Sequence, residues 1–286
     1  MIVGSGGRLG AALLRKYQDK FDVVGFNHAQ LDLGNLDEIG RKLEGVDFDI
    51  LINVAAFTNV DLCEKEIDQA FLINAEAPRT LAEICRDKKA KLIHFSTDYV
   101  FDGEKREPYT EDDMAKPISV YGESKREGEK LVLQTQDRHL VVRVSWVFGP
   151  DRPSFVDGII KRARENKYVE AIADKFSTPT YTIDIAQMLP RFFDLGVGGG
   201  ILHFANAGEC SWQEYAQFSL DCCRSLGIPL KAKTVGILKL SDMKSWIARR
   251  PVYSVLSTTK YISITGTTPR GWRDAVADYV REFVPR

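Results

Sequence analysis

Tyr121 and Lys125 have the residue types and the spacing of a proton-transfer pair. They are four residues apart in a helix predicted to begin near Ser119, so both lie on one face and the ammonium can approach the phenol. A free tyrosine titrates at about pH 10, too high for efficient proton exchange at neutral pH. A neighbouring cation favours the phenolate and lowers its pKa. We therefore predict acid–base catalysis by Tyr121 tuned by Lys125, with a solvated helix pair as the alternative.

A hydroxyl group is expected close to this pair. Thr97 comes 24 residues before Tyr121 and directly follows a predicted strand. In an open α/β sheet, ligands bind beyond the carboxyl ends of the strands. Thr97, or the adjacent Ser96, could therefore hold a substrate carbonyl oxygen while Tyr121 donates the proton.

The chain opens with a glycine loop between a predicted strand and a predicted helix. The glycines Gly4, Gly7 and Gly10 give the pattern GxxGxxG. Such glycines permit a tight turn and let backbone N–H groups approach a pyrophosphate at the positive end of the helix. This placement predicts a dinucleotide-binding loop, and a simple flexible turn is the alternative.

The end of the second predicted strand bears on the choice of dinucleotide. An acidic residue there would bind the ribose 2′-hydroxyl of NAD, but the chain has Asn27-His28. Arg8 in the glycine loop, together with His28, could instead meet a 2′-phosphate. We therefore expect NADP(H) in preference to NAD(H), with a solvated loop charge as the alternative role of Arg8.

The apolar pattern indicates the scaffold that positions these residues. Short apolar runs alternate with amphipathic stretches, which is typical of βαβ units and a parallel sheet. We predict an α/β fold in which residues 1–148 form a Rossmann-type, doubly wound parallel sheet that binds NAD(P). The first strand is short, which a naturally short strand or a start placed too far downstream would explain. The expected strands are Met1–Val3, Asp22–Phe26, Ile50–Asn53, Lys91–Ser96 and Leu140–Val144, and the expected helices include Leu9–Lys20, Leu36–Leu43 and Asp68–Lys88.

The pattern changes from about Gly149. Residues 149–286 are predicted to form mainly a smaller α/β lobe that binds the substrate, with segments that return to the first domain. Helices are expected at Ser154–Asn166, Asp184–Asp194, Trp212–Leu226 and Trp272–Phe283, and strands at Val169–Ile172, Ile201–Ala205 and Leu230–Val235.

The composition argues against several classes of protein. The formal net charge of −1 gives no basic surface for nucleic acid, and no apolar run reaches the roughly 18 residues of a membrane span. The glycine loop begins at once, so no signal peptide is expected. The five cysteines form no CxxC pair, and the four histidines lie far apart. We therefore expect a cytoplasmic protein that has reduced cysteines and needs no metal.

Several longer strings extend these motifs to most of the chain. They are Asn53–Asp61, Leu72–Ala75, Ser96–Gly103, Val120–Gly122, Arg143–Gly149 and Ala248–Leu256. With the glycine loop and the Tyr/Lys pair, they resemble the dTDP-4-dehydrorhamnose reductases of the extended short-chain dehydrogenase/reductase family. That family often has glutamine and glycine where this chain has Lys175 and Ser177, which leaves the exact sugar nucleotide open.

The resemblance implies roles for individual residues. Thr97, Tyr121 and Lys125 match the catalytic trio, with Tyr121 and Lys125 also next to the cofactor. Asp98, Trp146 and Arg249 match positions near the substrate, a nucleotide sugar. The further cofactor-binding positions are Gly4, Gly7, Arg8, Leu9, Gly10, Asn27, Asp32, Leu33, Ala56, Phe57, Thr58 and Asn74.

The implied reaction is reduction by NAD(P)H of the 4-keto group of a nucleoside-diphosphate deoxy sugar. Tyr121 would protonate the developing alkoxide while Thr97 holds the oxygen. Reductases of this kind can form homodimers, some of them with Mg²⁺, but no carboxylate cluster in the sequence indicates that metal.

Two other functions stay open. The regulatory β subunit of methionine adenosyltransferase carries a string like Thr97–Gly103 and would bind NADP as a structural ligand. Such a module has no need of the complete set of Thr97, Tyr121 and Lys125. An epimerase or a dehydratase could also use the Tyr/Lys pair, but a dehydratase would carry a carboxylate where Tyr99 follows Asp98.

Overall fold

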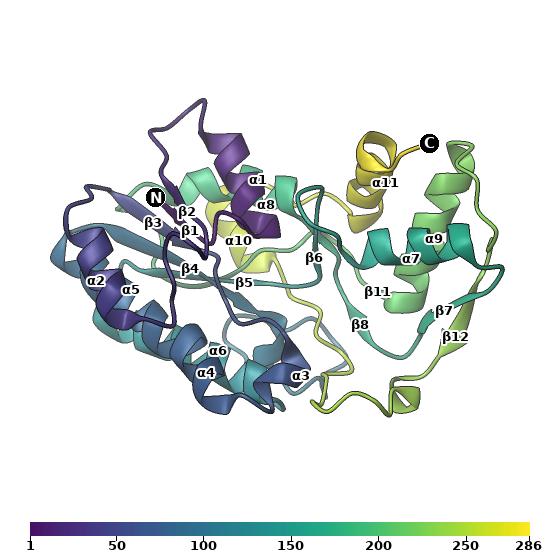
Figure 1. Ribbon diagram of the computed structural model, residues 1–286, viewed down its shortest axis with the longest axis horizontal. Coiled ribbons are helices and arrows are strands. Elements are labelled where there is room, and N and C mark those ends of the chain that lie inside the picture. Colours follow the sequence, from purple (N-terminus) through teal and green to yellow (C-terminus); the bar gives the residue numbers. More distant parts are fainter.

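The computed structural model describes residues 1–286, and a six-stranded parallel sheet forms the centre of its larger part (Figure 1). The strand order is β10-β5-β4-β3-β1-β2. The chain moves outward from β1 to β2 and then returns to β3 on the other side of β1, so the order reverses at β1. The strands are β1 (Ile2–Val3), β2 (Gly25–Phe26), β3 (Ile50–Asn53), β4 (Lys91–Thr97), β5 (Leu140–Val144) and β10 (Gly200–His203).

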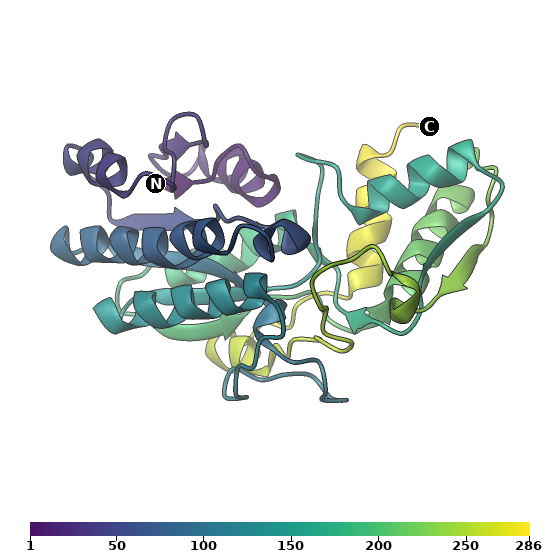
Figure 2. The same ribbon diagram turned by 60° about the horizontal axis from the view of Figure 1, so that its bottom comes forward.

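Helices cover both faces of this sheet, which confirms the predicted doubly wound architecture. Successive side chains of a strand point to opposite faces. Ile52 and Ile93 accordingly join a core with α1 (Arg8–Tyr17), α8 (Thr182–Met188) and α10 (Thr259–Thr265). Leu51 and Leu92 join the opposite core, with α2 (Leu36–Glu44), α5 (Ala77–Asp87) and α6 (Val120–Thr135). Figure 2 shows α5 in blue and α6 in teal, side by side along the sheet.

A second group of elements lies beside the sheet, on the right of Figure 1. It has its own apolar core, which includes Phe148, Tyr181, Tyr215 and Trp272. Its short strands pair two by two. Three later elements, β10, α8 and α10, return to the large sheet. The group comprises β6 (Val147–Phe148), α7 (Phe155–Glu165), β7 (Val169–Ile172), β8 (Phe176–Ser177), β9 (Thr180–Tyr181), β11 (Cys210–Ser211), α9 (Trp212–Ser225), β12 (Val235–Leu238) and α11 (Trp272–Phe283).

The long helix predicted over Asp68–Lys88 is three segments in the structure. They are α4 (Ile67–Phe71), a π-helical segment (Leu72–Glu76) and α5. The wider π turn contains Asn74, whose side chain is fully buried and bonds outside the helix. Hydrophobic periodicity cannot reveal such an insertion, because the apolar face continues through it.

One strand of the second group lies later in the chain than predicted. The expected strand Leu230–Val235 is a connection that ends where β12 begins. Lys231 and Ala232 donate their backbone N–H groups to the Ala163 carbonyl near the end of α7, so these residues close a helix and do not pair with β7. No helix of the structure combines the length and the apolar character that crossing a membrane requires.

The glycine loop depends on a close contact between α1 and the end of β1. A Cβ atom at Gly10 would lie 2.1 Å from the Gly4 carbonyl oxygen, whereas one at Gly40 in α2 would meet nothing within 4 Å. We predict that Gly10→Ala lowers the free energy of unfolding by about 1–3 kcal/mol or more because the backbone must move. Gly40→Ala should raise it by about 0.4–1 kcal/mol. Urea unfolding of both variants checks this, and equal effects would contradict the contact.

Candidate active site

A cleft of about 1290 Å³ runs along the carboxyl ends of the central strands. It reaches from the glycine loop, past the segment after β3, to the end of β4 and the first turns of α6. The sheet reverses its strand order here, and ligands of open α/β sheets bind at such a point. Most of the residues predicted to act on a ligand line it, namely Gly4, Gly7, Arg8, Leu9, Asn27, Asp32, Leu33, Ala56, Phe57, Thr58, Thr97, Asp98, Tyr121, Lys125 and Trp146.

Three predicted residues do not line this cleft. Gly10 packs against the turn of the glycine loop, where it leaves no room for a side chain. Asn74 is fully buried behind the cleft wall. Arg249 is exposed, while its neighbour Arg250 makes two contacts of 2.9 Å with the Asp61 carboxylate. The predicted contact of Arg249 with the substrate stays a prediction, and the ion pair of Arg250 next to it was not predicted.

The Arg250–Asp61 pair joins the segment before Pro251 to α3 (Val60–Cys63). Asp61 also accepts the backbone N–H groups of Ile247 and Ala248, each at 2.9 Å. The hydrogen bonds from Arg250 lower the pKa of Asp61 to about 2. The carboxylate therefore stays charged at neutral pH and keeps the segment on α3.

Tyr121 lies in the first turn of α6, close to the end of β4. Ser119 caps this helix by accepting a hydrogen bond from the Gly122 N–H at 3.2 Å. A Cβ at Gly122 would lie 2.3 Å from the Tyr99 carbonyl oxygen, so only glycine allows α6 to come this close. Burial raises the pKa of the Tyr121 phenol, and a hydrogen bond with Thr97 opposes this shift in part. Tyr121 is therefore a protonated phenol at neutral pH.

Lys125 lies one turn further along α6 and is 1% exposed. Its ammonium donates to the Phe95 carbonyl at 2.7 Å and lies 3.2 Å from His94 Nε2. Burial lowers the pKa of Lys125 to about 8, against the charge of Glu129. The groups that shift the pKa of Tyr121 do not include Lys125. Burial therefore sets the direction of the Tyr121 pKa, and the tuning of Tyr121 by Lys125 stays a prediction.

Thr97 and Asp98 come next to Tyr121 at the end of β4. The Thr97 hydroxyl contacts Asp98 Oδ1 at 3.1 Å. Asp98 is 2% exposed, and burial raises the pKa of its carboxyl group, while the charge of Lys175 opposes that shift. Its second oxygen accepts three serine hydroxyls, from Ser145, Ser177 and Ser254 at 3.2, 3.3 and 2.5 Å. The interactions of Asp98 are therefore mainly internal.

Lys175, which replaces the glutamine often found in the family, lies in this region. It is fully buried and donates to the Pro251 carbonyl at 2.7 Å. Its ammonium lies 5.2 Å from the ring centre of Tyr99 and 5.8 Å from that of Trp146, both in the cleft wall. Burial lowers its pKa to about 8, and the charge of Asp98 acts in the opposite direction. No local pattern predicts these contacts, since the partners of Lys175 come from three distant segments of the chain.

Arg8 lines the cleft, but its guanidinium points to the second group of elements. It donates to the carbonyl oxygens of Val147 at 3.1 Å and Arg152 at 3.2 Å, and also to that of Pro153. Arg152 in turn donates to the Gly6 carbonyl at 3.0 Å and lines the cleft. Sequence reasoning missed Arg152, because its closeness to the glycine loop follows only from the tertiary fold.

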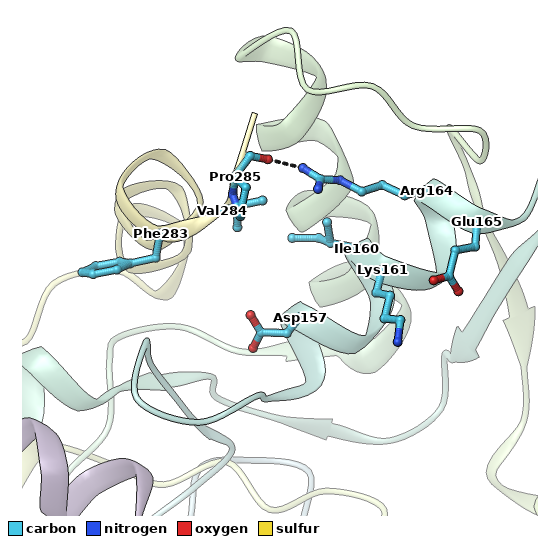
Figure 3. Close-up of a pocket in the computed structure, with 8 residues that line it drawn as sticks. All are labelled: Asp157, Ile160, Lys161, Arg164, Glu165, Phe283, Val284 and Pro285. Carbon is cyan, nitrogen blue, oxygen red and sulfur yellow. Dashed lines mark hydrogen bonds between the residues drawn. The ribbon is translucent and has the colours of Figure 1, made fainter.

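A second hollow, of about 320 Å³, lies between α7 and the end of the chain (Figure 3). Arg164 donates there to the Pro285 carbonyl. No residue predicted to be functional lines this hollow, and the structure has no group of three or more His, Cys, Asp or Glu residues that could hold a metal ion.

The parallel sheet, the glycine loop and the Tyr/Lys pair beside Thr97 define the class as an extended short-chain dehydrogenase/reductase. The family model described as RmlD substrate binding domain matches residues 1–284. The chain therefore belongs to the RmlD family within that class.

Similar proteins cover nearly the whole chain. The chain is 36% identical over 287 residues to dTDP-4-dehydrorhamnose reductase of Mycolicibacterium smegmatis, covering 99% of this chain and 85% of that protein. It is 34% identical over 283 residues to the spore coat polysaccharide biosynthesis protein SpsK of Bacillus subtilis, covering 99% and 96%. A solved structure of dTDP-4-dehydrorhamnose reductase from Bacillus anthracis in complex with NADP superimposes with a TM-score of 0.91, at 30% identity, and covers 98% of both chains.

Asn74 supports the cleft wall from behind, which leads to a testable prediction. Its side chain accepts the Phe57 N–H at 2.8 Å and donates to the Phe57 carbonyl at 3.1 Å. Asn74→Ala leaves both groups without their partner, at a cost of about 1–3 kcal/mol each where they stay buried. We expect weaker dinucleotide binding and lower stability, measured by fluorescence titration and urea unfolding.

Asn74→Asp is the matched control, because a carboxyl group that stays protonated in this buried place keeps the acceptor for the Phe57 N–H and one of the two donors, which in Asn74 serve the Phe57 carbonyl and the Ser124 hydroxyl. Its effect on both quantities should lie between those of the wild type and Asn74→Ala. Unchanged binding in Asn74→Ala would show that the wall does not depend on this residue.

Proposed function

We propose that the protein reduces the 4-keto group of a nucleoside-diphosphate deoxy sugar with NADP(H), as in the conversion of dTDP-4-dehydrorhamnose to dTDP-L-rhamnose. The observation that carries the proposal is that one cleft has the glycine loop in its wall and Thr97, Tyr121 and Lys125 beyond it. The names of the relatives support the same reaction.

The glycine loop fits a dinucleotide. Gly4 has a φ of 88°, and a Cβ there would lie 2.7 Å from the Ala55 nitrogen. Gly7 begins α1 without a side-chain cap, so the N–H groups of the first turn point to the place of a pyrophosphate. We propose that these residues hold the phosphates, with Asn27, Asp32 and Leu33 near the adenosine and with Ala56, Phe57 and Thr58 on the path to the nicotinamide. When bound, the cofactor supplies the hydride.

The preference for NADP(H) is also part of the proposal. The residues at the end of β2 are Asn27 and His28, not the acidic residue that would bind the ribose 2′-hydroxyl of NAD, and the Asp32 carboxylate lies 3.8 Å from His28 Nδ1. The Bacillus anthracis relative has NADP bound in its solved structure, which supports the same choice. Arg8 is an unsuitable 2′-phosphate ligand in the present arrangement, because its guanidinium is engaged with backbone carbonyls.

Tyr121 is the proposed proton donor. A phenol whose pKa is raised by burial holds its proton until negative charge develops on a nearby oxygen. Thr97, within hydrogen-bonding reach of that phenol, can donate to the same oxygen. Lys125 is proposed to place its amine by the nicotinamide ribose.

The substrate is proposed to lie between this trio and residues 149–286. Trp146 and Tyr99 form the wall beside Thr97, and Lys175 lies against both aromatic rings. Lys175 and Ser177 stand where the family often has glutamine and glycine, so they are the first residues to vary if another sugar nucleotide is preferred. Arg249 is also proposed to lie near the substrate, and the only support for this is that it precedes Arg250 in the chain.

The cofactor and the substrate can be tested in one assay. We expect dTDP-4-dehydrorhamnose to be reduced with loss of dihydronicotinamide absorbance, and faster with NADPH than with NADH. Tight NADPH binding without turnover would contradict the proposal and favour an NADP-binding regulatory subunit. Faster turnover with NADH would overturn only the cofactor preference.

The role of Tyr121 predicts a specific kinetic defect. Tyr121→Phe should lower turnover by about 10²–10⁴-fold, the usual contribution of a positioned acid, and leave NADPH affinity nearly unchanged. Tyr215→Phe is the matched control, because this buried tyrosine lies outside the cleft and its hydroxyl has no hydrogen-bond partner. Normal turnover in Tyr121→Phe would exclude this residue as the proton donor.

A further inference from the structure

We infer that His94 is a positioning residue that holds Lys125 against β4 and, through its tautomer, favours the uncharged lysine amine. The catalytic consequence rests on the proposed function, whereas the contact and the tautomer do not.

His94 connects two buried side chains that the proposed mechanism leaves unconnected. It lies in the middle of β4 and is fully buried. Its Nδ1 is 3.1 Å from Asn53 Nδ2 on the neighbouring strand β3. Its Nε2 is 3.2 Å from Lys125 Nζ on α6. The ring therefore fills the space between the central strand β3 and the proposed catalytic lysine.

Asn53 determines which ring nitrogen carries the proton. Its Oδ1 accepts the Ala55 N–H at 3.1 Å, so its NH₂ group must face the ring. An amide NH₂ can only donate, so His94 Nδ1 has to accept and carries no proton. In the neutral ring the proton is then on Nε2, directed at Lys125.

This arrangement discriminates between the two forms of Lys125. An ammonium group has donors only, so it cannot accept the hydrogen bond from Nε2–H, whereas a neutral amine has a lone pair that can. The amine still donates to the Phe95 carbonyl. A charged Lys125 requires the tautomer with the proton on Nδ1, so that Nε2 can accept. The Asn53 amide would then have to rotate to offer its oxygen to Nδ1–H, and the Ala55 N–H would lose its acceptor.

The surroundings keep His94 neutral. Burial and the charge of Lys125 both hold the pKa of His94 well below its usual value. The Glu129 carboxylate on α6 is engaged by Ser96 at 2.6 Å and by Arg143 at 2.8 and 2.7 Å, so its charge is already compensated. Arg126 on α6 lies 3.4 Å from Glu129 Oε2, and the charges of Asp98 after β4 and Cys63 at α3 act on Tyr121, one turn before Lys125.

The tautomer of His94 can be observed directly in the wild-type protein. Long-range ¹H–¹⁵N correlation spectra with labelled histidine should show His94 as a neutral ring protonated at Nε2 above the pH at which Lys125 loses its charge. The His94 signals are identified by their loss in His94→Gln. A ring protonated at Nδ1, or an imidazolium, would overturn the inference, and the spectrum needs neither substrate nor turnover.

Substitution at His94 should change the titration of Lys125. Glutamine can turn its carbonyl oxygen to the ammonium, so His94→Gln should shift the Lys125-dependent limb of NADPH binding and of turnover upward by about one pH unit, the size of one hydrogen bond. His94→Leu removes the contact, so it should weaken NADPH binding, and His94→Gln should restore part of it. A pH profile of His94→Gln identical to that of the wild type would overturn the inference.

His139→Gln is the control for a general effect of losing a buried histidine. His139 is also fully buried, but it contacts the Leu92 N–H and the Ala82 carbonyl, outside the cleft. This variant should leave the pH profile unchanged. If the wild type binds NADPH but turns over no keto sugar, the proposed function fails, while the tautomer and the pH dependence of NADPH binding still test the role of His94.

Discussion

The close approach of α6 to the end of β4 is the constraint on which the site depends. Gly122 permits it, because a Cβ there would lie 2.3 Å from the carbonyl oxygen of Tyr99, just after β4. Gly128 lets the same helix approach the π-helical segment, where a Cβ would lie 2.1 Å from the Asn74 carbonyl oxygen. Because the helix lies this close, Lys125 reaches the Phe95 carbonyl and Tyr121 lies beside Thr97. A helix displaced by the width of one methyl group would separate the groups that the reaction needs together.

The same contact places several charged groups in the interior. Lys125 and Lys175 are both almost fully buried, and Glu129 and Arg143 form a buried pair with two hydrogen bonds. Burying a charge is unfavourable unless hydrogen bonds or a partner compensate it. Here backbone carbonyls receive the lysines and serines surround Asp98. The dielectric constant of this interior is low, so a change of charge during the reaction strongly alters the electrostatic energy of neighbouring groups.

Local patterns were sufficient to predict the sheet, the glycine loop and the helix that carries Tyr121 and Lys125. Period-two and helical apolar patterns, the Ser119 cap and the glycine spacing are all properties of neighbouring residues. Two features could not be predicted because each depends on distant contacts. They are the π-helical turn at Asn74 and the connection before β12, where Lys231 and Ala232 donate to the Ala163 carbonyl.

The hydrogen-bond partners of the charged groups at the site could not be predicted for a similar reason. Spacing places Tyr121 and Lys125 on one helix face, but His94 and the Phe95 carbonyl on β4 decide where the ammonium lies. Arg8 likewise looks like a phosphate ligand in sequence, while carbonyl groups about 140 residues later engage its guanidinium. Such partners follow from the strand order and not from the motif.

The most direct measurement is the fate of deuterium from NADPH labelled at the nicotinamide C4, with either face labelled in turn, when dTDP-4-dehydrorhamnose is the substrate. We expect one of the two labels to appear on C4 of the sugar, as seen by NMR and by the mass of the product. A product without deuterium from either label, or no product although both ligands bind, would contradict direct hydride transfer at this site.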